Sequence, residues 1–349
     1  MAISITQTDI RKLTREDLTE WFLAHGEKKF RAKQVYEWLW KRGAHSFDEM
    51  TNLSKGLREK LRAEFLINGI ETDTVQHSND GTIKTRFRLH DGHFIEAVLI
   101  PVPADKRFTV CVSSQVGCSL TCSFCATGKM KRVRNLDAAE IYDQVVLVNR
   151  QCEATFGAPL TNIVYMGMGE PLLAYRPVME SIDHITGEHG LGMSPRRITI
   201  STAGIAKMIG KLADDNSKVN LALSLHAAND EKRDRIMPIN ETNQLDLLMD
   251  ALHYYYRQTR NRISYEYIAL RDFNDSIDDA RQLVKLCRRF PVKVNIIEYN
   301  PIGDGLFSSS SEDKIDAFAR YLRDQEVTVT VRRSRGKDID AACGQLANK

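Results

Sequence analysis

The feature that most limits the possible folds is a regular alternation of strand-like and helix-like segments between residues 107 and 332. The strands are mostly apolar on both faces, and the segments between them have helical spacing of apolar residues. This order is typical of a parallel sheet built by right-handed crossovers. Strands are predicted at 107–113, 161–166, 196–202, 219–225, 263–270, 292–299 and 327–332, and helices at about 136–152, 175–187, 204–213, 244–258, 277–289 and 312–324.

This pattern gives about six β/α units, too few for a full eight-unit barrel. The fold class is therefore α/β, with either an incomplete barrel or an open sheet. Two further strands, 82–90 and 92–101, precede the alternation and are predicted to form a hairpin around the turn at 90–92.

The first 65 or so residues are predicted to be helical instead. Helices are expected at 14–26, where Thr14 is a plausible cap and Gly26 a stop, at 31–43 and at 54–65. All three tryptophans of the chain, Trp21, Trp38 and Trp40, lie here and are expected to form a small core. We therefore divide the chain into a helical accessory domain, 1–80, and an α/β domain, 81–349, which ends in a polar tail at about 333–349.

The most informative motif is a C-x3-C-x2-C sequence made by Cys118, Cys122 and Cys125, in the loop after the strand at 107–113. A structural zinc site normally needs four Cys or His ligands, and no second C-x2-C or paired His follows. Three thiolates this close suit an iron–sulfur cluster with one iron left open, which can bind S-adenosylmethionine and pass one electron to it. A zinc knuckle completed by Cys111 or a distant His is the alternative.

Polar or glycine residues follow several of the predicted parallel strands. Because ligands of α/β folds bind beyond the carboxyl ends of the strands, these residues are candidates for contacts to a cofactor. Glu170 could pair with the cofactor's ammonium group, and Phe124 could pack near its adenine. The candidate strand-end residues are Gly169, Glu170, Ser201, Ser224, Leu225, His226 and Asn300.

Cysteine usage and charge narrow the class of protein further. Seven cysteines, an odd number, argue for reduced thiols, and no apolar run is long enough for a membrane helix. We expect a soluble, cytoplasmic protein that does not bind membranes. The net charge is only +3, but basic clusters at 129–134 and 332–337 hint at a partner that carries phosphate.

Cys343 lies in the polar tail between Gly336 and Gly344. A cysteine in such a tail is commonly incidental. Alternatively, it is a mobile thiol that reaches the ligand of the open iron, with Cys111 as a second thiol that resolves it. Spacing alone leaves both interpretations open.

Taken together, these motifs resemble one family over nearly the whole chain. CVSSQVGCSLTCSFCATG, MGMGEPLLAY, SPRRITISTAGI, ALSLHAAN, MPIN, EYNP and DIDAACGQL occur in that order. They are similar to the radical S-adenosylmethionine RNA methyltransferases of the RlmN/Cfr type. The resemblance implies a partial (β/α)6 barrel behind a small RNA-binding domain, one 4Fe-4S cluster per chain and two molecules of S-adenosylmethionine per turnover.

The activity implied is methylation of carbon 2 of an adenine in 23S rRNA (at the peptidyl transferase centre) and of adenine 37 in tRNA. By resemblance, Cys118, Cys122 and Cys125 hold the cluster, Cys343 carries a methyl group and then the RNA, and Cys111 releases the product by forming a disulfide with Cys343. Glu96 is expected to accept the proton of carbon 2, and the strand-end residues are expected to contact the cofactor. An electron donor such as flavodoxin and a monomeric state are also implied.

Three alternatives remain, one within this resemblance and two outside it. The antibiotic-resistance branch methylates carbon 8 of the same ribosomal adenine, but Pro171 resembles the carbon 2 branch, since the other branch tends to carry Ala. From a different class, a non-catalytic iron–sulfur protein that binds RNA would not need Cys343. A radical enzyme acting on a small molecule would give the basic residues beside the cluster no role.

Overall fold

The computed structural model describes residues 7–348. Its centre is a ten-stranded sheet in the order β14-β13-β12-β11-β10-β9-β6-β5-β4-β3. The seven strands from β14 to β6 are parallel to their neighbours, and β5, β4 and β3 continue the sheet in antiparallel fashion. In sheet order the strands are β14 (Thr328–Arg332), β13 (Lys293–Glu298), β12 (Ile263–Ala269), β11 (Asn220–Ser224), β10 (Ile198–Thr202), β9 (Asn162–Tyr165), β6 (Arg107–Cys111), β5 (Phe94–Val102), β4 (Ile83–Arg88) and β3 (Glu71–His77).

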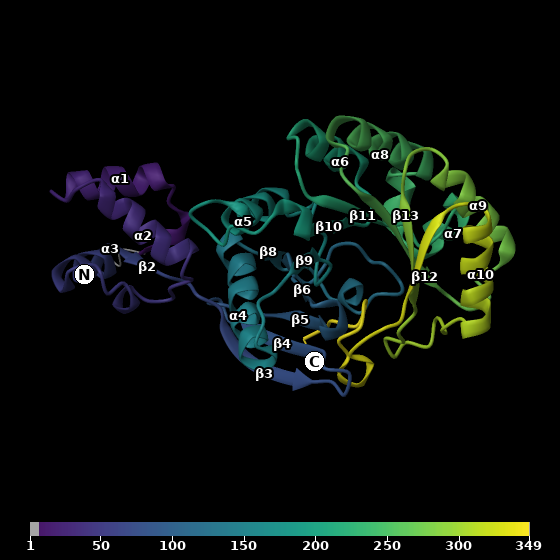
Figure 1. Ribbon diagram of the computed structural model, residues 1–349, viewed down its shortest axis with the longest axis horizontal. Coiled ribbons are helices and arrows are strands. Elements are labelled where there is room, and N and C mark those ends of the chain that lie inside the picture. The colour runs from purple at the N-terminus through teal and green to yellow at the C-terminus, as the bar shows by residue number, and fades with distance from the viewer. Residues whose placement is uncertain (1–6, 349) are drawn as a thin grey trace.

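Helices connect the parallel strands, as predicted, and Figure 1 shows them along the outer side of a curved sheet. They are α4 (Ala138–Phe156), α5 (Tyr175–Thr186), α6 (Ala206–Asp214), α7 (Asp230–Ile236), α8 (Leu245–Thr259), α9 (Ile277–Cys287) and α10 (Glu312–Asp324). Since β14 and β3 are the two ends of the sheet and do not pair with each other, the barrel is incomplete. The prediction of about six β/α units is confirmed.

The N-terminal part contains α1 (Arg15–Ala24), α2 (Phe30–Trp40) and α3 (Lys55–Glu64), with a short parallel pair of β1 (Thr8–Asp9) and β2 (Phe65–Leu66). Thr14 begins α1 as expected, because its hydroxyl accepts the N–H of Asp17 while the Asp17 carboxylate accepts the N–H of Thr14. The three helices predicted here are confirmed.

Strand β3 was not predicted, and it changes where the sheet begins. Its residues are nearly all exposed, so it lacks the apolar face that identifies a strand in sequence. It pairs with β4 along its length, from Glu71 opposite Arg88 to His77 opposite Ile83. A domain boundary that keeps the sheet whole therefore lies before Glu71 and not at residue 80.

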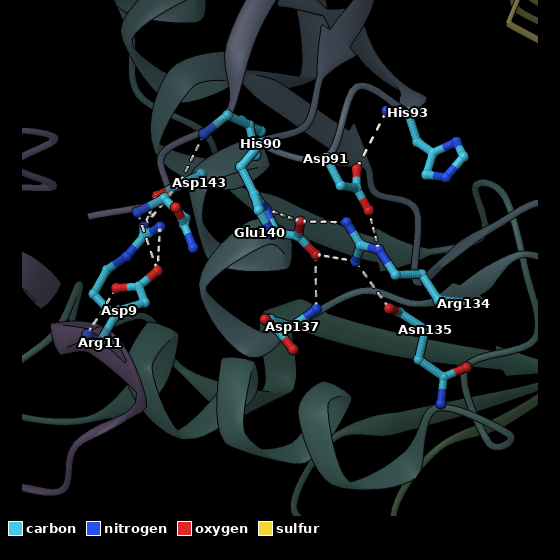
Figure 2. A network of polar contacts seen from close by, with 12 residues as sticks. Asp9, Arg11, His90, Asp91, His93, Arg134, Asn135, Asp137, Glu140 and Asp143 are labelled. Atoms are coloured by element: carbon cyan, nitrogen blue, oxygen red, sulfur yellow. Dashed lines mark hydrogen bonds and ion pairs between the residues drawn. The ribbon is translucent and has the colours of Figure 1, made fainter. Parts of the chain in front are cut away.

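The N-terminal part is attached to α4 and α5 through buried polar and aromatic contacts. Arg11 lies 2.9 Å from Asp143 of α4, and both side chains are almost completely buried (Figure 2). The Trp40 ring stacks on His184 of α5 at 3.5 Å between ring centroids. Trp40 is buried as predicted, and Trp21 and Trp38, which are partly exposed, pack against the same hydrophobic cluster.

Within residues 7–348, no helix is both long and apolar enough to cross a bilayer.

Candidate active site

The cysteine loop begins directly after β6 and is closed by a short antiparallel ladder. In this ladder β7 (Gln115–Val116) pairs with β8 (Arg134–Asn135). Gly117 follows β7 with a φ of +72°, and a Cβ atom there would overlap the backbone of Lys131. Only glycine fits this close approach of two chain segments, which places Cys118 beside Lys131.

Cys118, Cys122 and Cys125 line one pocket, which encloses about 900 Å³ including its open mouth. Burial raises the pKa of all three thiols, that of Cys118 to about 11. The free thiols are therefore protonated near neutral pH, and binding of a metal has to displace these protons.

The three cysteines fit an iron–sulfur cluster better than a zinc ion. The described residues contain no group of three or more His, Cys, Asp and Glu placed around a single metal ion. Ligands of one zinc ion must converge on it, whereas the thiolates of a 4Fe-4S cluster bind different irons. The loop packs closely on Gly128, where a side chain would not fit, because a Cβ atom there would lie 2.8 Å from the Cys122 carbonyl oxygen.

Glu170 is a buried carboxylate that follows β9 in the chain and lines the pocket. Its oxygens accept the N–H groups of Ala203 at 2.7 Å and Leu172 at 3.0 Å. Burial nevertheless raises its pKa to about 6, and no cationic side chain in the described chain forms an ion pair with it. A ligand ammonium group would supply the missing positive charge.

The ends of β10 and β11 also reach the pocket. Ser201 and Ser224 lie beside each other with hydroxyl oxygens 3.3 Å apart, and both line the pocket with His226. Burial lowers the pKa of His226 to about 3, so the ring is neutral, and its Nδ1 accepts the N–H of Ile268. Phe124 also lines the pocket and packs edge-on against this ring at 4.8 Å.

Two predicted cofactor residues do not line the pocket. The Leu225 side chain is fully buried in the core. Asn300 is buried as well, and its amide donates to the Ser334 hydroxyl at 2.9 Å, where the tail begins. Gly169 does line the pocket, with a φ of +98°.

Sequence reasoning missed Arg233, a buried cation behind the strand ends. Its guanidinium donates to the backbone oxygens of Ala203, Ser224 and Leu225. It therefore ties the ends of β10 and β11 together. The residue lies in α7, a short and highly charged helix without an apolar period, which was not predicted either.

The tail crosses the open side of the incomplete barrel and brings Cys343 to the same pocket. In Figure 1 the yellow C-terminal segment runs back from the β14 side toward β4 and β5. Gly344 accepts the N–H of Ala126 at 2.7 Å, and Leu346 accepts the Thr127 hydroxyl at 2.6 Å, so the tail is bound to the cysteine loop. Cys343 lines the pocket and its side chain is exposed there.

Cys111 is the last residue of β6 and is buried below this region. Burial raises the pKa of its thiol, and a negative charge on Cys343 raises it further. Both cysteines are free thiols.

Glu96 lies on β5 and contacts the tail instead of the pocket. Its carboxylate accepts the backbone N–H groups of Ala347 and Asn348 at 2.9 and 3.1 Å. Lys84 of β4 lies 3.4 Å from the other carboxylate oxygen.

The two basic clusters are largely neutralised within the protein. Arg134 pairs with Glu140 and Asp91 at 2.7 and 2.6 Å (Figure 2), and Lys129 lies 3.1 Å from Asp304. In the second cluster, Arg332 faces Glu266, while Arg333 and Lys337 both pair with Glu298. Of the first cluster, only Lys131 and Arg132 form no ion pair within the described chain.

An incomplete β/α barrel with three cysteines in the loop after its first parallel strand defines the radical S-adenosylmethionine class. The model of the Radical SAM superfamily matches residues 112–286, and that of the ribosomal RNA large subunit methyltransferase N-terminal domain matches residues 8–67.

The chain belongs to the RlmN family. It is 57% identical to a probable dual-specificity RNA methyltransferase RlmN of Christiangramia forsetii, over 98% of this chain and 96% of that protein. It is 45% identical to the dual-specificity RNA methyltransferase RlmN of Geobacter sulfurreducens, over 99% and 93% of the two chains. The crystal structure of a radical SAM methyltransferase from Sphaerobacter thermophilus superposes with a TM-score of 0.92 at 40% identity, covering 98% of this chain and all of that one. The resemblance seen in the sequence is thereby confirmed.

Proposed function

We propose that this protein is a radical S-adenosylmethionine RNA methyltransferase. It methylates carbon 2 of an adenine in 23S rRNA and of adenine 37 in tRNA, through a methylated Cys343. The observation that carries the proposal is that Cys343, far away in sequence, lines the same pocket as Cys118, Cys122 and Cys125. Family membership supports the RNA substrate.

The pocket residues divide into those that hold the cluster and those that hold S-adenosylmethionine. Cys118, Cys122 and Cys125 would bind three irons of a 4Fe-4S cluster, and the bound cluster supplies the electron that converts S-adenosylmethionine to a 5′-deoxyadenosyl radical. The Glu170 carboxylate binds the ammonium group of the cofactor. Ser201, Ser224 and the neutral His226 offer hydroxyl and imidazole groups to its polar atoms.

Gly169 lets the backbone come close to this ligand. The cofactor assignments of Leu225 and Asn300 rest on the resemblance, and in the structure these residues support strand ends and the tail.

The two thiols outside the cluster motif act in sequence. The Cys343 thiol loses its proton and takes a methyl group from one molecule of S-adenosylmethionine, which leaves as S-adenosylhomocysteine, and the carbon of this group later becomes attached to the adenine. The Cys111 thiolate then attacks the Cys343 sulfur and forms a disulfide with it. The bond between the Cys343 sulfur and the transferred carbon breaks with its electron pair on that carbon, which takes up a proton. An external thiol reductant restores both cysteines.

Glu96 is proposed to take the proton of carbon 2 on the strength of the resemblance. In the described structure its Oε2 accepts two amides of the tail, whereas Oε1 accepts no hydrogen bond and is the oxygen left for a proton.

Partners and location follow from the substrates. The N-terminal part and the unpaired Lys131 and Arg132 would contact RNA phosphates. A protein electron donor such as flavodoxin would reduce the cluster, the enzyme would act as a monomer, and the ribosomal substrate places it in the cytoplasm.

The test is Cys343→Ser in anaerobically reconstituted enzyme. We expect the iron content and cluster absorbance of the wild type, with no methylation of 23S rRNA. Cys111→Ala should still attack RNA and accumulate a covalent protein–RNA species. Wild-type turnover by Cys343→Ser would refute the proposal, and loss of the cluster would show that Cys343 is a cluster ligand instead.

The position of the methyl group is tested separately by mass spectrometry of the product adenosine. Pro171 after Glu170 supports carbon 2, so 2-methyladenosine is expected. Finding 8-methyladenosine would assign the chain to the resistance branch.

A further inference from the structure

A buried ion pair lies under the tail, outside the pocket. Lys84 Nζ is 3.4 Å from Glu96 Oε1, and the two side chains are only 2% and 0% exposed. They stand on neighbouring strands of the β4–β5 hairpin, where Glu96 is paired with Arg86. Charges buried this deeply need further hydrogen bonds to offset the lost hydration.

The tail supplies those hydrogen bonds. Ala347 and Asn348 donate their backbone N–H groups to Glu96 Oε2 at 2.9 and 3.1 Å. Lys84 Nζ donates to the backbone oxygen of Asp340 at 3.5 Å. The ion pair thus binds the tail on both sides of Cys343, three residues before it and four residues after it.

Between these two attachment points the chain makes a turn with Cys343 in it. The N–H of Gln345 donates to the Ala342 oxygen at 3.1 Å, and the Ala342 N–H donates to the Gln345 side chain at 3.3 Å. The far side of the turn is held by the bond from Ala126 to Gly344. The position of the Cys343 thiol therefore depends on the two ends of the turn being held.

We propose that Lys84 and Glu96 are positioning residues that anchor the tail and present the Cys343 thiol to the pocket. The anchoring does not depend on the methylation reaction, but its importance for catalysis rests on the proposed function. For Glu96 this is a task beyond the proton transfer assigned to it by resemblance. For Lys84 it is a first assignment.

The anchor is tested in the full chain without cluster, cofactor or RNA. Hydrogen exchange of the segment 340–348 reports tail opening, and peptide mass spectrometry measures the rate at which iodoacetamide alkylates Cys343. We expect Glu96→Ala and Lys84→Met to accelerate both rates about tenfold or more, because anchoring hydrogen bonds are lost. Lys84→Arg keeps the cation and its donors and should restore wild-type rates, and Glu96→Gln keeps an acceptor and should be slower than Glu96→Ala.

Arg88→Ala is the matched control, since Arg88 also stands on β4 but forms an exposed ion pair, with Glu71 of β3. The proposal is overturned if Lys84→Met and Glu96→Ala leave both rates within about twofold of the wild type, or if Arg88→Ala changes them equally. If Glu96→Ala and Lys84→Met do not fold, a chain truncated after Leu346 lacks the amide donors of Ala347 and Asn348 and leaves the β4–β5 hairpin intact. Unchanged alkylation of Cys343 in that chain also overturns the anchor.

These readouts separate the anchor from the proposed function. If the variants change the tail as expected but the wild-type enzyme methylates no RNA, the anchor is supported and the proposed function is refuted.

Discussion

Gly117→Ala should prevent cluster binding without unfolding the protein. The wild-type φ of +72° is left-handed, and an alanine there costs about 1–2 kcal/mol. In addition, the new Cβ atom would overlap the Lys131 backbone oxygen, which is not a flexible group that can move aside cheaply. The ladder between β7 and β8 must then open.

The cost of that opening can be worked from the contacts. The bond from the Val133 N–H to the Val116 oxygen, at 2.9 Å, and the two residue pairs of the ladder lie immediately before Gly117, and the bridge between Cys118 and Lys131 lies immediately after it. Losing two hydrogen bonds of about 1 kcal/mol each brings the total to about 3–4 kcal/mol. Because Cys118 is the next residue, the displacement moves a cluster ligand directly.

Two further alanine variants separate the cost of the left-handed backbone from the steric cost of the new Cβ atom. Gly26 has nearly the same φ, +73°, but open space around it, so Gly26→Ala carries only the backbone cost. Gly56 lies within α3, also in open space, and Gly56→Ala should stabilise the protein by up to about 1 kcal/mol. After anaerobic reconstitution we expect Gly117→Ala to lose most of its iron, while the other two bind as much as the wild type. Equal iron in Gly117→Ala and Gly26→Ala would refute the steric reasoning.

Three further predictions concern charges in and near the site. The pKa of Glu170 is raised from 4.5 to about 6, so its protonated form stabilises the fold; this contribution is complete below about pH 4.5 and is lost as pH rises through 6. Without cofactor, the unfolding free energy of Glu170→Gln relative to the wild type should therefore rise by about 2 kcal/mol between pH 4 and pH 7.5, and a constant difference would contradict the buried carboxylate. Arg233→Met removes the buried donor to the Ala203 and Leu225 oxygens and to the Asn240 side chain, so we expect a loss of about 3 kcal/mol or more in denaturant unfolding, whereas an unaffected midpoint would argue against this brace. Replacing both Lys131 and Arg132 by alanine should weaken RNA binding and reduce its salt dependence by the equivalent of up to two phosphate contacts. Lys129→Ala is the control and should change RNA binding less, because Lys129 is already paired with Asp304.

The elements with strong periodic signals were predictable. The alternation of apolar strands and amphipathic helices set the class of fold, and the spacing of Cys118, Cys122 and Cys125 set the site, because both signals are local in sequence. β3 and α7 were missed because an exposed edge strand and a short charged helix bury too little apolar surface to leave a pattern.

What escaped prediction depends on contacts between distant segments. The sequence shows the charges at 129–134 but not that Arg134 is paired with Asp91, which lies 43 residues earlier in the chain. In the same way, the sequence does not show that Glu96 binds amides of the tail, because those amides lie about 250 residues away. Arg233 gave no signal, because three of its partners are backbone oxygens, which every residue has.

Helix α4 connects the cysteine loop to the N-terminal part. Glu140 in its first turn binds Arg134, and Asp143, three residues on, binds Arg11 (Figure 2). The two carboxylates are thus about 4.5 Å apart along the helix axis, and inserting one residue between them would rotate one by about 100° relative to the other. Insertions and deletions should therefore be tolerated in surface loops such as 187–194 but not between 140 and 143, where the helix fixes the spacing between the contacts of the N-terminal part and those of the cysteine loop.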